Sequence, residues 1–140
     1  MLQQILVGPV LRPDDQFHLA IDLNSLIGAD VTGFNGYTVV TKIRFNENLV
    51  GGSRIRLSLQ SPLNASGSVS AVYFGVAAST GNAYNFASTP VQLTFSGQTG
   101  RTLTAKKVFV LDPVTFDFNP AQAHIVAMNV NASSLRRRTA

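Results

Sequence analysis

The side chains that most often carry catalysis are scarce in this sequence. It has no cysteine and only two histidines, His18 and His124. No serine lies in the G-x-S-x-G turn that exposes the nucleophile of many hydrolases, and GGSRI at residues 51–55 has Ile55 where the second glycine would stand. A serine nucleophile needs an oriented base beside it. We therefore predict no catalytic residue and no enzyme activity, with His18 facing outward from a strand and His124 at a strand edge.

Two carboxylates lie close together near the end of the sequence. Asp112 and Asp117 flank the turn in LDPVTFDFN, where together with Asn119 they would offer oxygen ligands to calcium. Asp and Asn are also frequent at turns and strand ends, which leaves a purely structural interpretation open. Phosphate-binding patterns of the GxGxxG or GxxxxGK[ST] type are absent. We predict no cofactor and assign no metal ligand.

One segment is a candidate for binding a sugar or a receptor. Such sites need exposed aromatic side chains, and the sequence has no tryptophan. The segment STGNAYNF is rich in turn-forming residues and contains Tyr84 and Asn85. We predict a loop at the tip of the fold here and name these two residues as a candidate ligand-binding pair.

Alternating apolar and polar residues predict the elements that must position these side chains. FHLAIDL (17–23), YTVVTKIRF (37–45) and RIRLSLQ (54–60) alternate with period two, which is typical of half-buried strands. VSAVYFGV (69–76), VQLTF (91–95), KVFVLD (107–112) and AHIVAMNV (123–130) are apolar on both faces, which predicts central or covered strands. Gly, Asn, Ser and Pro clusters separate the runs. We predict an all-β fold, an antiparallel β-sandwich or jelly roll of about eight or nine strands.

Length and charge divide the sequence into three parts. The 140 residues suffice for one domain with its own core. We predict an N-terminal arm or extra strand at residues 1–36, a jelly roll at 37–132 and a basic C-terminal tail at 133–140. The first part carries one basic and four acidic residues, a net charge of −3. Three of the four net positive charges belong to Arg136, Arg137 and Arg138.

The charge distribution and the apolar runs exclude two kinds of partner. Without its three terminal arginines the chain has a net charge of only +1, which does not supply a basic face for nucleic acid. No stretch approaches the roughly 18 apolar residues of a membrane span, and no basic segment precedes an apolar run as in a secretory signal. We therefore expect neither nucleic acid nor a membrane as a partner.

From Gly52 to Val130 the order of motifs resembles the β-sandwich domain that precedes the catalytic domain of some GDSL-type esterases. GSRIRL (52–57) resembles its first strand, TFSG (94–97) its turn and DPV (112–114) the start of a later strand. The resemblance implies a jelly-roll accessory module that binds or packs against another protein. No GDSL catalytic domain follows these motifs here, so we expect no esterase activity.

The size, the absence of cysteine and the neutral polar composition also resemble the cement or decoration proteins of tailed-phage capsids. That resemblance implies a homotrimer on the capsid surface, whose terminal arms contact a major capsid or other virion protein. We accordingly expect a non-enzymatic virion structural protein that stabilises the shell at subunit junctions. A carbohydrate- or receptor-binding module of a tail or spike is the alternative.

Both ends of the sequence are predicted to take part in such an interface. Leu2, Ile5, Leu6 and Val7 would anchor the N-terminal arm. Arg136, Arg137 and Arg138 would anchor the tail, because guanidinium groups bind carboxylates and carbonyl oxygens of a neighbouring subunit through paired hydrogen bonds. A solvated end without a partner is the alternative for the tail.

Overall fold

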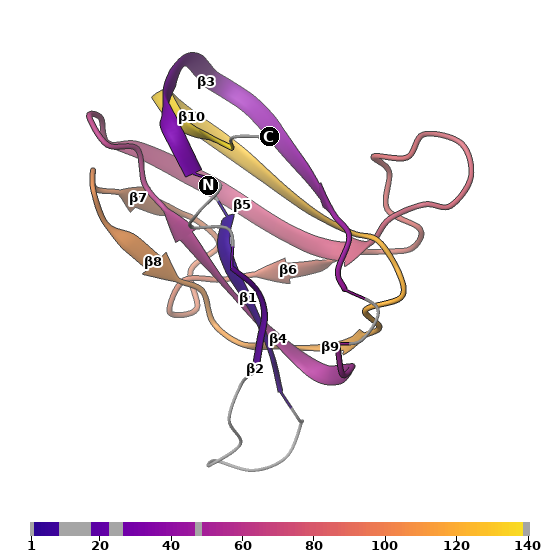
Figure 1. The fold of residues 1–140 in the computed structure, drawn as a ribbon. Helices are drawn as coiled ribbons and strands as arrows, with labels where there is room; N and C mark the ends of the chain where they lie inside the picture. The colour runs from indigo at the N-terminus through magenta and orange to yellow at the C-terminus, as the bar shows by residue number, and fades with distance from the viewer. Residues whose placement is uncertain (1, 9–17, 23–26, 47–48, 139–140) are drawn as a thin grey trace.

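Two antiparallel β-sheets make up the structure. The computed structural model of the chain describes residues 2–8, 18–22, 27–46 and 49–138, with positions 3, 8, 18–22, 27–31, 34–35 and 135–138 described by their backbone alone. The helices and strands of these residues comprise ten β-strands and no helix (Figure 1). The predicted all-β sandwich is confirmed, with slightly more strands than the eight or nine expected.

Sheet A contains the strand nearest the N-terminus. Its members are β1 (Leu2–Gly8), β2 (His18–Asp22), β4 (Gly52–Gln60), β8 (Val108–Val110) and β9 (Val114–Phe118). The order is β2-β1-β4-β8, and β9 also pairs with β4. Strand β1 is hydrogen-bonded on both sides, with Ile5 opposite Ile21 of β2 and Leu57 of β4. The described part of residues 1–36 therefore contributes inner and outer strands of the sandwich.

Sheet B contains the two longest strands. Its members are β3 (Ile27–Ile43), β10 (His124–Arg138), β5 (Gly67–Val76), β6 (Val91–Leu93) and β7 (Arg101–Leu103). The order is β3-β10-β5-β6, and β7 also pairs with β5. The segments 69–76 and 123–130 thus form the central strands of this sheet, as their apolar faces predicted.

Beyond Ala132, strand β10 loses its pairing with β5 and pairs with β3 alone. Residues 27–33 and 133–138 therefore form a two-stranded extension, which we call the β3–β10 ribbon. It curls over one end of the sandwich (Figure 1). The predicted boundary between the jelly roll and the tail, at residue 133, falls inside β10.

The core lies between the sheets and is built by inward-facing strand residues. Ile55, Leu57 and Leu59 are buried on the inner face of β4, which confirms the alternation in RIRLSLQ. Strand β8 differs from its prediction. Its apolar sequence suggested a central or covered strand, but β8 is the edge of sheet A, and Val108 and Val110 are 47% and 56% exposed.

Candidate functional site

Three of the four apolar residues predicted as interface anchors lie in the chain's own core. Leu2, Ile5 and Val7 are buried against residues of both sheets. A neighbouring subunit could reach them only if β1 left its place between β2 and β4. The structure thus corrects their assignment, since their burial stabilises this chain itself. Leu6 alone among the four lies on the outer face, where it is half-buried.

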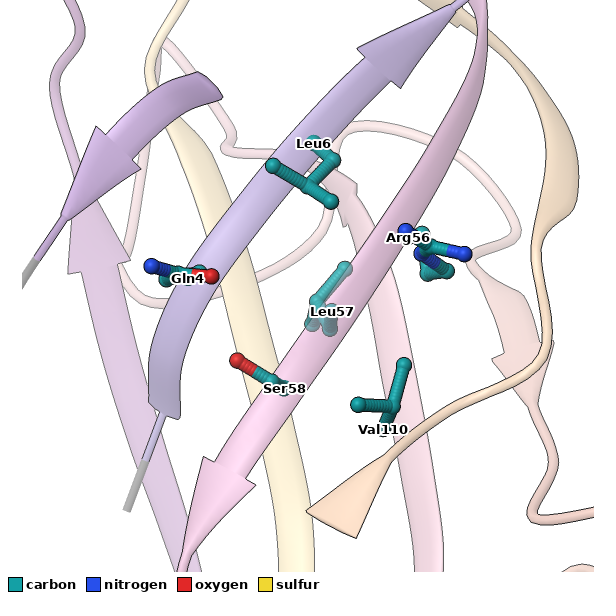
Figure 2. A pocket seen from close by; sticks show the side chains of 6 residues that line it. All are labelled: Gln4, Leu6, Arg56, Leu57, Ser58 and Val110. Atoms are coloured by element: carbon teal, nitrogen blue, oxygen red, sulfur yellow. The ribbon is translucent and has the colours of Figure 1, made fainter. Parts of the chain in front are cut away.

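Leu6 lines a shallow hollow on the outer face of sheet A (Figure 2). The hollow measures about 100 Å³, and its lining residues come from β1, β4 and β8: Gln4, Leu6, Arg56, Leu57, Ser58 and Val110. Small-molecule sites commonly measure about 300–1,000 Å³. The hollow is therefore the right size for one side chain of another protein. The sequence offered only a weak signal for it, namely apolar Leu6 and Val110 at outward positions.

The three arginines predicted as tail anchors belong to the β3–β10 ribbon. In this ribbon Arg136 lies opposite Asp30 and Arg138 opposite Ile27. Their side chains lie outside the described part of the structure. The backbone thus carries the arginines on a paired strand at the end of the sandwich.

Tyr84 and Asn85 lie in the loop between β5 and β6, which projects from the body of the molecule (Figure 1). Tyr84 is 60% exposed. Its backbone N–H donates to Asn82 Oδ1 at 2.9 Å, and the N–H of Asn85 donates to the Asn82 carbonyl at 3.0 Å. The loop is closed at its base by the hydrogen bond from the N–H of Ala78 to the carbonyl of Asn85, at 2.8 Å. This arrangement presents an aromatic side chain on an ordered turn.

Phe86 anchors the same loop to the outer face of sheet B. It packs against the small buried cluster formed by Ala77, Ile125 and Ala127. The ring of Phe86 covers Gly75, where a Cβ atom would come within 2.8 Å of Phe86 Cδ1. The exposed Tyr84 and the half-buried Phe86 thus have separate roles, one available for contact and one fixing the loop.

Asp112 holds a turn rather than pointing into a cluster of ligands. Its carboxylate accepts hydrogen bonds from Thr94 Oγ1 at 2.6 Å, from the N–H of Gly97 at 2.7 Å and from the N–H of Ser96 at 3.0 Å. The bonds from Thr94 and Gly97 are the main reason that the pKa of Asp112 lies below its ordinary value of 3.8. Asp117 is exposed on β9. Among the described residues, no three His, Cys, Asp or Glu side chains gather closely enough to hold a metal ion.

His124 is fully buried, which its predicted position at a strand edge did not reveal. It begins β10, the strand between β3 and β5. Its ring stacks on Phe118 and Phe74, with centroids 5.0 and 5.3 Å away and interplanar angles of 28° and 13°. The rings of Phe45 and Phe116 lie edge-on at 5.5 and 5.8 Å. We call these five residues the five-ring cluster.

Neither ring nitrogen of His124 has a hydrogen-bond partner. Burial lowers the pKa of His124 from its ordinary value of 6.5, and the backbone of Gln122 opposes this shift only in part. The sequence signal for this cluster is the inward position of Phe74, Phe116 and Phe118 on their strands. Which of these strand ends meet depends on the sheet topology.

Comparison with models of known protein families finds no match, and no curated protein matches the sequence. In the part of the chain that the structure describes, no helix is long and apolar enough to cross a membrane.

Proposed function

We propose that the chain is a non-enzymatic structural protein that joins or stabilises a larger assembly through its sheet edges and outer faces. The most specific form of this proposal is a capsid cement or decoration protein. It would self-associate, as a homotrimer, on the capsid surface and contact a major capsid or other virion protein at subunit junctions.

The observation that carries the proposal is the free edge of β3. This strand is 17 residues long and lies at the end of sheet B, where it pairs only with β10 among the described residues. An edge strand presents unpaired backbone groups that can pair with another chain, and single-chain proteins usually protect such edges with charged residues or proline. From Val31 to Thr41 the sequence has neither.

The side chains along this edge support the same proposal. Tyr37 is 59% exposed and Val40 is 38% exposed, so apolar surface lies along this edge strand. Only 13% of the residues in the sequence are charged. Burial of such a surface against another subunit therefore removes few charges from water, which keeps the desolvation cost low.

The assembly part of the proposal is tested by substituting a lysine at the β3 edge. Native mass spectrometry of the full chain should show a trimer, and Val40→Lys should shift it to monomers by bringing like charges together at the interface. Val50→Lys is the matched control, because Val50 is an exposed valine outside the strands. A wild-type chain that stays monomeric at all concentrations would contradict this part.

The virion part is tested separately. Mass spectrometry of purified virus particles should detect the chain. The chain should still be detected after the particles are washed in buffer and after they are treated with protease. Its absence from intact particles would overturn the virion location and leave the assembly part standing.

A second candidate function is a carbohydrate- or receptor-binding module, and the loop that carries Tyr84 favours it. An exposed tyrosine on an ordered turn can stack on a sugar ring without a large loss of conformational freedom. Binding on a glycan array that disappears with Tyr84→Ala would support this function. If the wild-type chain binds no sugar, the carbohydrate-binding version of this second function is excluded.

A further inference from the structure

The five-ring cluster connects the two sheets at one end of the sandwich. Phe74 and His124 belong to strands of sheet B, and Phe45 follows β3 of the same sheet. Phe116 and Phe118 belong to β9 of sheet A. Contacts cross between the sheets, since Phe74 meets Phe116 at 4.8 Å and Phe45 meets Phe118 at 4.9 Å. His124 contacts all four phenylalanine rings and so lies at the centre of this connection.

No described charged side chain faces the imidazole ring from the strands around it. The titratable and charged residues on these strands each follow or precede an inward-facing residue, so strand alternation places them on the opposite faces. They are Lys42 and Arg44 beside Ile43 and Phe45, Tyr73 beside Phe74, Asp117 between Phe116 and Phe118, and Arg54 and Arg56 beside Ile55. A proton on His124 would therefore have no counter-ion in the cluster.

The neutral and protonated forms of the His124 side chain should differ in stability at this buried position. Neutral imidazole stacks as an aromatic ring between Phe74 and Phe118. Imidazolium would gain attraction from the two ring faces. It would also lose the water around its charge, a cost that the backbone of Gln122 offsets only in part. The second effect is larger, in agreement with the lowered pKa of His124, whose main cause is burial.

We infer that His124 is an acid-operated latch, which holds β9 against sheet B while the imidazole is neutral and releases it when the imidazole takes up a proton. This inference rests on the five-ring cluster and does not depend on the proposed function.

Strand β9 is the element that such a latch would release. It has only five residues and, within the described ranges, pairs with β4 alone, through Phe118 opposite Gly52, Thr115 opposite Arg54 and Val114 opposite Ile55. Strand β5, by contrast, is paired with β10 on one side and with β6 and β7 on the other. Separation of β9 therefore breaks far fewer backbone hydrogen bonds than separation of β5, so the two strands should respond differently to acid.

Hydrogen exchange on the full chain tests the latch. Protection factors, which correct for the intrinsic effect of pH on exchange, are measured at pH about 7.5 and about 5, on either side of the ordinary histidine pKa. We expect the protection factors of residues 114–118 to fall roughly tenfold or more at the lower pH, which corresponds to a pKa difference of about one unit or more between the closed and open states. The protection factors of β5 should not change. His124→Phe should abolish this pH effect, and His124→Leu serves if phenylalanine does not fit.

The second histidine provides the matched control. The sequence has only two histidines, so His18→Gln identifies the imidazole signals of both residues by NMR. His18→Gln should keep the pH effect on residues 114–118, and the signal of His124 should titrate below that of a free histidine. The latch is overturned if protection of β9 does not fall in acid, if β5 loses protection equally, or if His124→Phe and His124→Leu retain the pH effect.

Discussion

The hydroxyl group of Thr94 donates a 2.6 Å hydrogen bond to Asp112 Oδ2, joining two segments 18 residues apart. The N–H of Asp112 donates in return to the carbonyl of Thr94 at 2.8 Å. Ser96 and Gly97 between them have positive φ angles of 51° and 79°, and their N–H groups point to the same carboxylate. The motifs TFSG and DPV are therefore two halves of one structural unit.

Removing the hydroxyl group of Thr94 should loosen this unit. Thr94→Val keeps the shape of the side chain but leaves Asp112 with two donors instead of three. We expect a melting temperature lower by a few degrees, measured by differential scanning calorimetry. Thr104→Val, at an exposed position, is the matched control and should leave it unchanged. Equal melting temperatures for the two variants would contradict the role of Thr94.

Asp112 should also make stability depend on acid pH. The hydrogen bonds from Thr94 and Gly97 lower its pKa below 3.8 in the folded chain, so the folded state holds its charged form at a lower pH than the unfolded state does. The stabilisation is complete above the ordinary value and is lost as pH falls below it. Urea denaturation between pH about 5 and about 2 should show a steeper loss for the wild type than for Asp112→Asn. Parallel curves would contradict this assignment.

Local sequence patterns predicted the positions of the strands well, but they did not predict which strands lie next to one another. The alternation in RIRLSLQ identified Ile55, Leu57 and Leu59 as inward-facing because a strand's period of two is a property of the backbone itself. The burial of His124 depends instead on Phe45, which follows β3, and on Phe118 of β9. Sequence spacing carries no information about such a meeting of distant segments.

The same reasoning explains the two ends of the chain. The run of three arginines predicted a basic tail anchored to a neighbouring subunit, with a solvated end as the alternative. The backbone pairing of Arg136 with Asp30 in the β3–β10 ribbon depends on the length of β3, which the alternation in YTVVTKIRF did not reveal. The apolar side chains of Leu2 and Ile5 indicated that these residues are buried against other residues. They are buried in the chain's own core.

Gly36 should be a sensitive position on β3. Its φ angle is +74°, and it is skipped in the pairing that sets Tyr37 opposite Val130 and Asn35 opposite Asn131. It is therefore the extra residue of a β-bulge, which bends the strand. No atom lies within 4 Å of a Cβ built on it, so only the backbone conformation requires glycine.

Gly36→Ala should destabilise the fold by about 1–2 kcal/mol, the cost of the left-handed conformation for a residue with a Cβ. The free energy of unfolding in urea measures the effect. Asn tolerates this conformation better than Ala, so Gly36→Asn is the informative control and should cost less. A larger loss for Asn than for Ala would show that the bulge is not what restricts this position.

Phe74 should contribute far more to stability than the aromatic residue of the projecting loop. It is fully buried and contacts Phe116 and His124, whereas Tyr84 is 60% exposed. Phe74→Ala should lower the free energy of unfolding by about 3–5 kcal/mol through lost burial and an unfilled cavity. Tyr84→Ala should change it by less than about 0.5 kcal/mol. Similar losses for both variants would mean that the loop is part of the cooperative core.

A methyl group at Gly75 should disturb the loop that carries Tyr84. The new Cβ would lie 2.8 Å from Phe86 Cδ1 and 3.3 Å from Pro90 Cβ, closer than packed carbon atoms normally approach. The Phe86 ring would have to move away from β5, and with it the loop that this ring anchors. We expect Gly75→Ala to cost about 1–3 kcal/mol as an overpacked contact and to speed proteolysis of residues 79–85.

A double-mutant cycle separates this contact from a general loss of stability. Phe86→Leu removes the ring edge that meets the new methyl group, so Gly75→Ala should cost less in the Phe86→Leu background than in the wild type. We expect a favourable coupling energy of about 0.5–3 kcal/mol from the unfolding free energies of the four proteins. Additive losses would indicate that the methyl group is opposed by something other than Phe86. The loop would then depend on its own hydrogen bonds, from Tyr84 and Asn85 to Asn82, rather than on its contact with β5.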